Sequence, residues 1–199
     1  MEKTSQRLII AITGASGVRY GVRLLELLRP LPIETHLVLS RSAEVTLACE
    51  TELKIADVQA LADHWYPAGD MAAAISSGSF RTMGMIIAPC SVRSMSEIAT
   101  GVTTSLVTRA ADVVLKERRR LVLMVRETPL HTGHLRTMTQ LSEMGAIIAP
   151  PVPAFYARPA SLEAMIDHSL GRVLDLSDID AGGVTRWGET RPARARRKD

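Results

Sequence analysis

Five short, largely apolar runs, separated by amphipathic stretches, constrain the fold of this chain more than any other feature. The runs occupy residues 8–13, 36–40, 85–89, 121–125 and 146–149. They do not alternate with polar residues, which is typical of strands that are covered on both faces. Apolar periodicity predicts helices over residues 20–28, 42–50, 102–116, 130–144 and 161–174. This alternation predicts an α/β fold with a mostly parallel, doubly wound sheet.

The length and charge of the chain indicate one domain with a basic end. The 199 residues suit a single domain, which we place at residues 1–189, and 46% hydrophobic residues can fill its core. Residues 191–199 hold five basic residues and one acidic residue, so the other 190 residues carry a net charge of about −1. We interpret residues 190–199 as a basic, disordered tail. Nucleic-acid binding is not predicted, because it needs a basic face on the fold itself.

Other patterns exclude metal and membrane proteins. Cys49 and Cys90 are too few for a zinc motif or a disulfide framework. The five histidines show neither an HxxxH pattern nor a carboxylate-paired spacing, so we predict no metal site. No run approaches the roughly 18 apolar residues that span a bilayer, and the first residues lack a signal-peptide pattern. We therefore expect a cytoplasmic protein with no membrane partner.

The segment ITGASGVRYG, residues 12–21, follows the first apolar run and opens a helix. Glycines let the backbone approach a ligand closely, and the amides at a helix start attract an anion. The pattern is neither GxGxxG nor a P-loop. Ser40 ends the second run, where a dinucleotide site would have an acidic residue. The loop therefore favours a mononucleotide over NAD, with a tight turn that packs helix on strand as the alternative.

A second loop, IAPCSVRS at residues 87–94, follows the third run. Its hydroxyl residues precede an expected helix with Ser94 or Ser96 as its cap, and ordinary capping is one explanation for them. The other is ligand binding, because ligands of doubly wound sheets lie beyond the carboxyl ends of the strands.

Charged residues on one predicted helix and after one predicted strand suggest a phosphate site. Arg109 and Lys116 are two helical turns apart and share a face with Asp112 between them, which suits either a two-cation grip on a phosphate or an ion-paired surface. Arg126 and Glu127 follow the fourth run. Glu127 is a candidate general acid or base, with an ion pair to Arg126 as the alternative.

Three further residues have unusual positions. Glu50 ends a predicted helix, where the dipole disfavours a carboxylate, so it is either there by chance or it faces positive charge in a site. Tyr156 follows the stiff segment PPVP, and Arg172 lies in the last predicted helix. Together they suit a phosphate clamp, or else an amphipathic anchor and a surface charge.

Taken together, these motifs resemble those of the UbiX/Pad1-like flavin prenyltransferases. The resemblance runs from about residue 8 to residue 187 and rests on ITGASGVRYG, HLVLS with Glu50, SSGSF, APCS, RAADVVLKERR, RETPLH, PPVPAFY and RWGE. It implies a Rossmann-like, flavodoxin-related three-layer sandwich that assembles as a homo-oligomer, a dodecamer. It also implies metal-independent transfer of a dimethylallyl group from dimethylallyl phosphate to N5 and then C6 of reduced FMN. The product, prenylated FMN, would serve a UbiD-type decarboxylase.

The resemblance also assigns roles to individual residues. The catalytic residues it implies are Ser16, Glu50, Lys116 and Glu127. The FMN-binding residues it implies are Gly14, Ala15, Ser16, Ser40, Ser91, Val92, Arg93, Ser94 and Arg126. The residues implied for dimethylallyl phosphate, partly across a subunit boundary, are Arg109, Lys116, Tyr156 and Arg172. Two positions depart from the family pattern: Arg93 replaces a lysine or small residue, and Met71 lies where some members have a bulky aromatic.

Two other functions remain open at this point. One is an FMN-dependent decarboxylase of the aromatic-acid or cysteine type. The cysteine type has an active-site histidine in the first helix and an asparagine in the second loop, and this chain has neither. The other is a flavin carrier without catalytic activity.

Overall fold

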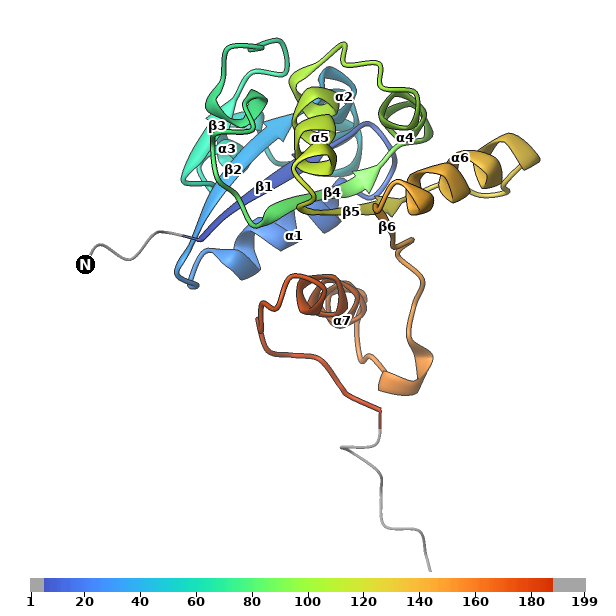
Figure 1. Cartoon of the computed structure of the whole chain (residues 1–199). Coiled ribbons are helices and arrows are strands. Elements are labelled where there is room, and N and C mark those ends of the chain that lie inside the picture. The colour runs from blue at the N-terminus through green and yellow to red at the C-terminus, as the bar shows by residue number, and fades with distance from the viewer. Residues whose placement is uncertain (1–5, 188–199) are drawn as a thin grey trace, which may run out of the picture. The chain divides into compact units, whose positions relative to one another are not determined.

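The computed structural model describes residues 6–187, which form two compact units, residues 6–151 and residues 152–187 (Figure 1). The predicted tail at residues 190–199 lies outside the described residues. One domain over residues 1–189 stays a prediction. Every helix within residues 6–187 is too short or too polar to cross a bilayer.

A six-stranded parallel sheet forms the centre of the first unit and confirms the predicted α/β class. Its strands, in chain order, are β1 (Gln6–Ile12), β2 (Ile33–Leu39), β3 (His64–Tyr66), β4 (Gly84–Cys90), β5 (Arg120–Val125) and β6 (Ile147–Ile148). Their order across the sheet is β3-β2-β1-β4-β5-β6, with every pair parallel. All seven residues of β4 are buried, as expected for a central strand that is covered on both faces.

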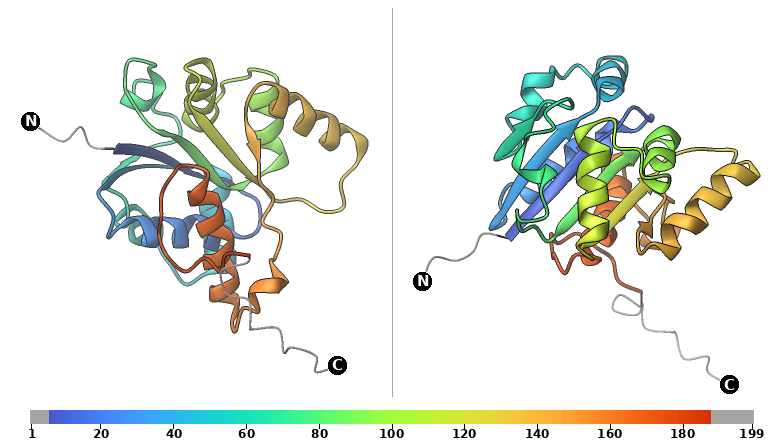
Figure 2. Two further views of the ribbon diagram at one scale, coloured as in Figure 1. Left: turned by 60° about the horizontal axis from the view of Figure 1, so that its bottom comes forward. Right: turned by 45° about the horizontal axis from the view of Figure 1, so that its top comes forward.

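Helices cover both faces of this sheet. They are α1 (Val18–Leu28), α2 (Arg41–Glu50), α3 (Ile55–Gln59), α4 (Val92–Ala99), α5 (Leu106–Lys116) and α6 (Thr132–Glu143), with a short 3-10 turn, η1 (Ala74–Ser76). Figures 1 and 2 show α1 and α5 on opposite faces, and α4 lies beside α5. Gly21 allows α1 to approach β4 closely, because an added Cβ would lie 2.3 Å from the Ala88 carbonyl oxygen.

The order of the strands places a switch point between β1 and β4. The chain winds outward from β1 through β2 to β3, and then returns to β4 on the other side of β1. The loops after β1 and β4 therefore lead to helices on opposite faces of the sheet, α1 and α4. In open α/β sheets, this divergence creates the crevice in which ligands bind.

The second unit contains the short 3-10 turn η2 (Phe155–Ala157) and the helix α7 (Leu162–Asp175). The Ser161 side chain caps α7 by accepting a hydrogen bond from the Ala164 amide. The Tyr156 ring packs edge-to-face against the rings of His168 on α7 and of Trp187. These aromatic contacts anchor the end of the stiff PPVP segment onto the helix.

Candidate functional site

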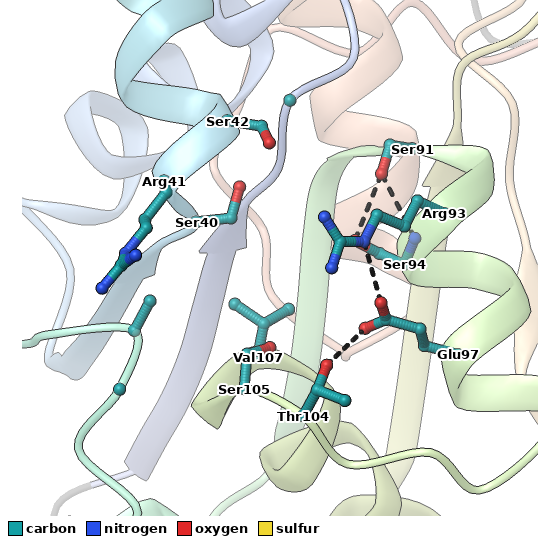
Figure 3. A pocket seen from close by; sticks show the side chains of 13 residues that line it. Ser40, Arg41, Ser42, Ser91, Arg93, Ser94, Glu97, Thr104, Ser105 and Val107 are labelled. Atoms are coloured by element: carbon teal, nitrogen blue, oxygen red, sulfur yellow. Dashed lines mark hydrogen bonds and ion pairs between the residues drawn. The ribbon is translucent and has the colours of Figure 1, made fainter.

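A pocket of about 400 Å³ opens at the carboxyl edge of the sheet (Figure 3). Its lining comes from the loops after β1, β2 and β3 and from the starts of α4 and α5. These residues are Gly14, Ser40, Arg41, Ser42, Ala68, Gly69, Ser91, Arg93, Ser94, Glu97, Thr104, Ser105 and Val107. A cavity of this volume, lined by a few convergent polar groups, is of the size that holds a small-molecule ligand or cofactor.

Thr13 joins the two loops that meet at the switch point. Its side chain is buried, and the hydroxyl donates to the Pro89 carbonyl at 2.7 Å. The same oxygen accepts a hydrogen bond from the Ser91 amide at 2.8 Å. One hydroxyl therefore fixes the loop after β1 against the loop after β4, and both loops contribute residues to the pocket lining.

Three helix starts converge on the pocket. Ser40, Ser91 and Ser105 line it and cap α2, α4 and α5. Each side chain satisfies only one of the first-turn amides of its helix, and the aligned peptide dipoles leave partial positive charge at each start. The pocket therefore suits an anionic group such as a phosphate. The expected caps of α4, Ser94 and Ser96, were wrong, because β4 continues through Pro89 to Cys90 and Ser91 is the first residue after the strand.

The glycine loop after β1 is shaped by close contacts. A Cβ added to Gly14 would lie 2.3 Å from Ser42 Cβ, so only glycine fits between the loop and α2. Gly17 has a φ of 98° and precedes α1. Its amide and that of Val18 donate to the carboxylate of Glu50, at 2.8 to 3.0 Å. The predicted attraction of an anion to this helix start is therefore satisfied by the chain's own Glu50.

A chain of polar contacts forms one wall of the pocket (Figure 3). Arg93, on the first turn of α4, is largely exposed and donates to Glu97 at 2.9 Å. The other oxygen of Glu97 accepts from the Thr104 hydroxyl at 3.1 Å. The bond between Glu97 and Thr104 links α4 to the segment before α5. The bond between Arg93 and Glu97 gives Arg93 a partner within the chain, which the family pattern did not predict.

Arg109 and Lys116 both face the segment SSGSF, residues 76–80, which confirms that they share one face of α5. Arg109 donates to the Ser76 carbonyl at 3.2 Å, and a Cβ added to Gly78 would lie 2.8 Å from Lys116 Nζ. Both cations also have acidic partners: Arg109 pairs with Asp112 at 2.8 Å, and Lys116 pairs with Glu117. The Glu117 pKa is lowered mainly by its hydrogen bond from Lys116.

The segment SSGSF is held in place by a further cation. Arg119, which lies between α5 and β5, donates to the carbonyls of Gly78 and Phe80 at 2.7 and 2.8 Å. With the bond from Arg109, three guanidinium hydrogen bonds therefore fix this segment against α5.

Other predicted site residues lie outside the pocket lining. Ala15 and Ser16 belong to the loop after β1, Val92 is the first residue of α4, and Arg109 and Lys116 lie further along α5. Arg126 and Glu127 are exposed after β5, and the Glu127 carboxylate accepts from the Thr128 amide at 2.9 Å.

Tyr156 and Arg172 belong to the second unit. Tyr156, in η2, contacts His168 on α7. Arg172 lies one helical turn after His168, so Tyr156 and Arg172 lie at neighbouring turns of α7. Arg172 donates to Asp175 at 2.6 Å, and Arg186 donates to the same carboxylate. The Asp175 pKa is lowered, chiefly by the hydrogen bonds from Arg186.

Several lining residues were not predicted from the sequence. Thr104 and Ser105 form a hydroxyl pair before an amphipathic helix, which is a capping signal, and Ala68 and Gly69 follow β3. One histidine does have a carboxylate-paired spacing: Glu34 and His36 are two residues apart on β2, and Glu34 Oε1 lies 3.1 Å from His36 Nε2. The prediction that no histidine has such a spacing is therefore wrong.

The fold and the pocket define the class of this protein: it is an α/β protein with a nucleotide-sized site at its topological switch point. Residues 1–186 match the protein family described as Flavoprotein. The flavin prenyltransferase UbiX of Escherichia coli strain K12 is 61% identical over 171 residues, which cover 85% of this chain and 90% of that protein.

Two solved structures are similarly close. One is AnUbiX (PadA1) in complex with FMN and dimethylallyl pyrophosphate, with a TM-score of 0.91, 50% identity and coverage of 94% of this chain and 99% of that chain. The other is a dodecameric FMN-dependent UbiX-like decarboxylase from Escherichia coli O157:H7, with a TM-score of 0.89, 49% identity and coverage of 92% and 99%. The chain belongs to the UbiX-like flavin prenyltransferases, within the flavoprotein family.

Proposed function

We propose that this chain transfers a dimethylallyl group from dimethylallyl phosphate to N5 and then C6 of reduced FMN, and so makes prenylated FMN. The observation that carries the proposal is the pocket at the switch point, onto which the capped starts of α2, α4 and α5 converge. It occurs in a chain that is 61% identical to a flavin prenyltransferase.

FMN would bind in this pocket. Gly14, Ser40, Ser91, Arg93 and Ser94 line it and are assigned to FMN here. The backbone at Gly14 can approach the flavin because it carries no side chain. The hydroxyls of Ser40 and Ser94 can donate to polar atoms of the ligand, whereas the Ser91 hydroxyl donates to Ser94 Oγ at 3.2 Å. The adjoining residues assigned to FMN are Ala15, Ser16, Val92 and Arg126. When bound and reduced, FMN supplies the nucleophilic nitrogen, and the pocket holds it in one orientation toward the allyl carbon.

Four residues are assigned to the phosphate of the prenyl donor: Arg109, Lys116, Tyr156 and Arg172. The cations among them would stabilise the charge that develops on the departing phosphate. Arg109 and Lys116 lie on α5 outside the pocket lining and face the segment SSGSF. We therefore assign part of this group to a neighbouring copy in a homo-dodecamer, an assembly that a relative of 49% identity forms.

The proton transfers are assigned to Glu127 with Ser16, which lie on exposed segments beside the sheet edge. Closing the ring at C6 releases a proton, and a carboxylate at this rim can accept it. Glu50 is assigned to stabilising the allyl cation. Its carboxylate is fixed by the amides of Gly17 and Val18, so its charge is held at the start of α1, next to the glycine loop. The product would pass to a UbiD-type decarboxylase in the cytoplasm.

Mass spectrometry of the bound flavin tests the proposal. The protein is incubated without oxygen with dithionite-reduced FMN and dimethylallyl phosphate, and the flavin should gain one five-carbon unit. Bound FMN of unchanged mass would instead indicate a flavin carrier. Release of CO2 from an aromatic acid by the protein alone would indicate a decarboxylase, the activity named for the Escherichia coli O157:H7 relative.

Two substitutions test the assigned roles. Lys116→Ala and Glu127→Gln should keep FMN bound and slow prenylation by about 100-fold or more, which is typical for loss of an electrostatic or acid–base group. Arg136→Ala and Glu143→Gln change exposed charges on α6 and serve as matched controls with unchanged rates. Normal turnover in Lys116→Ala or Glu127→Gln would contradict the role assigned to that residue.

A further inference from the structure

A cluster of two histidines and one carboxylate lies between β2 and β3, and its residues do not contribute to the pocket lining. His36 on β2 pairs with His64 on β3 in the parallel ladder, so the two side chains project from the same face of the sheet. Glu34 precedes His36 by two residues and shares that face. The two imidazole rings stack, with centroids 4.9 Å apart and planes 16° apart.

One oxygen of the carboxylate is shared by the two imidazoles. Glu34 Oε1 lies 3.1 Å from His36 Nε2 and 3.3 Å from His64 Nε2. Ligands of a tetrahedral Zn²⁺ ion, at about 2.0–2.2 Å from the metal, are separated from one another by roughly 3.3–3.5 Å. The three ligand atoms of the cluster all lie within 4.8 Å of one another, so a small adjustment of His64 would complete this geometry.

Two atoms that do not face the centre of the cluster, His36 Nδ1 and Glu34 Oε2, have other partners. The Tyr66 hydroxyl lies 2.9 Å from His36 Nδ1, and Arg7 Nε lies 3.3 Å from Glu34 Oε2. Outer contacts of this kind orient metal-binding side chains: a hydrogen bond at Nδ1 presents Nε2 to the metal. Arg7 in turn stacks on the Phe80 ring, 4.6 Å from its centroid, which keeps the guanidinium on the far oxygen.

The two imidazoles differ in exposure. The His36 side chain is buried. His64, by contrast, is half-exposed, so an ion can enter from solvent on its side.

We propose that Glu34, His36 and His64 bind one divalent transition metal ion of the Zn²⁺ class, with solvent in the fourth position. Two imidazoles and one carboxylate suit zinc and its neighbours, whereas Mg²⁺ and Ca²⁺ prefer all-oxygen ligands. The ion would tie β3, an edge strand of three residues, to β2 and so stabilise the segment that leads to Ala68 and Gly69 in the pocket. This site is structural and independent of the proposed prenyl transfer.

Metal titration of the full chain tests the site. The protein is purified without a histidine tag, freed of FMN and stripped of metal with a chelator. Zn²⁺ binding is then measured by calorimetry, and Co²⁺ binding by its visible absorption. We expect one Zn²⁺ per chain, a Co²⁺ spectrum of the tetrahedral type, and a Tm that rises with Zn²⁺ concentration because the ion binds only the folded state.

Two variants and one control make the test specific. Glu34→Gln and His64→Ala should each weaken Zn²⁺ binding by at least tenfold and abolish the Co²⁺ spectrum. His134→Ala removes one ring of a second stacked pair, His131 and His134, at the start of α6, and should bind as the wild type does. The metal-free Tm of each variant shows whether it folds, and His64, being half-exposed, is the variant least expected to misfold. No Zn²⁺ binding by the wild type, or unchanged binding by a folded His64→Ala, would overturn the proposal.

Discussion

Replacing Thr13 with valine should loosen the joint between the two loops of the pocket. The substitution keeps the shape of the side chain but removes a buried hydroxyl that donates to the Pro89 carbonyl and accepts from the Ser91 amide. Pro89 keeps the Thr13 amide as a donor at 3.2 Å, so the loss there is about 0.5–1.5 kcal/mol. The Ser91 amide loses the acceptor at the start of its helix, which costs about 1–3 kcal/mol.

The combined loss of about 1.5–4.5 kcal/mol corresponds to a Tm that falls by roughly 3–18 °C for a chain of this size. Thermal unfolding followed by circular dichroism measures it, and an FMN titration of the same variant should show weaker binding. Thr13→Ser is the matched control, because it keeps the hydroxyl and loses only a methyl group. If Thr13→Val unfolds like the wild type, or if Thr13→Ser is destabilised as much, the hydroxyl does not hold the loops together.

Three further predictions concern the glycine loop, Glu50 and the second unit. Gly14→Ala should lower the free energy of unfolding by about 1–3 kcal/mol, because the added Cβ overpacks against α2. Gly69→Ala is the control and should not lower it, since an added Cβ there meets nothing within 4 Å. Equal urea midpoints for the two variants would contradict this. Glu50→Gln should lower the Tm, and more at low salt than at high salt, because it removes the negative charge that faces the positive start of the α1 dipole. A fall in Tm that does not depend on salt would indicate a loss of packing alone. The pKa of Asp175 is lowered, mainly by its hydrogen bond from Arg186. The contribution of this carboxylate to stability is therefore present above its unfolded pKa of about 3.9, and it is lost as the pH falls through the lower pKa of the folded state. The free energy of unfolding of Asp175→Asn should therefore lie below that of the wild type at pH 6 and converge with it in acid, and a constant difference would refute the linkage.

The central strands of the fold could be predicted because their residues are continuously apolar. β3 was missed because its three residues, His64–Tyr66, are polar or aromatic and partly exposed, and because it pairs only at an edge. The helix predicted over residues 102–116 begins only at Leu106, since Ser105 and Thr108 form a capping box there. Local signals of this kind shift the end of an element without changing its type.

Site residues could be predicted from the sequence only where a single short segment, a strand end and the loop after it, identifies them. Gly14 and Ser91 follow predicted strands and Ser40 ends one, and topology then brings them to one pocket. The contribution of Glu97 and Thr104 depends on how α4 packs against α5, which no short segment encodes. The contact between Glu34 and His64 likewise depends on the pairing of two strands that are far apart in the sequence.

The central claim is that the pocket between the loops after β1 and β4 holds the flavin, with the prenyl donor beside it. A crystal structure of the full chain with FMN and dimethylallyl phosphate bound tests this most directly. We predict the isoalloxazine ring against Gly14 and Ser91, with the phosphate of the donor contacted by Arg109, Lys116, Tyr156 and Arg172 from adjoining copies. A flavin bound elsewhere, or a prenyl phosphate bound far from it, would contradict the account.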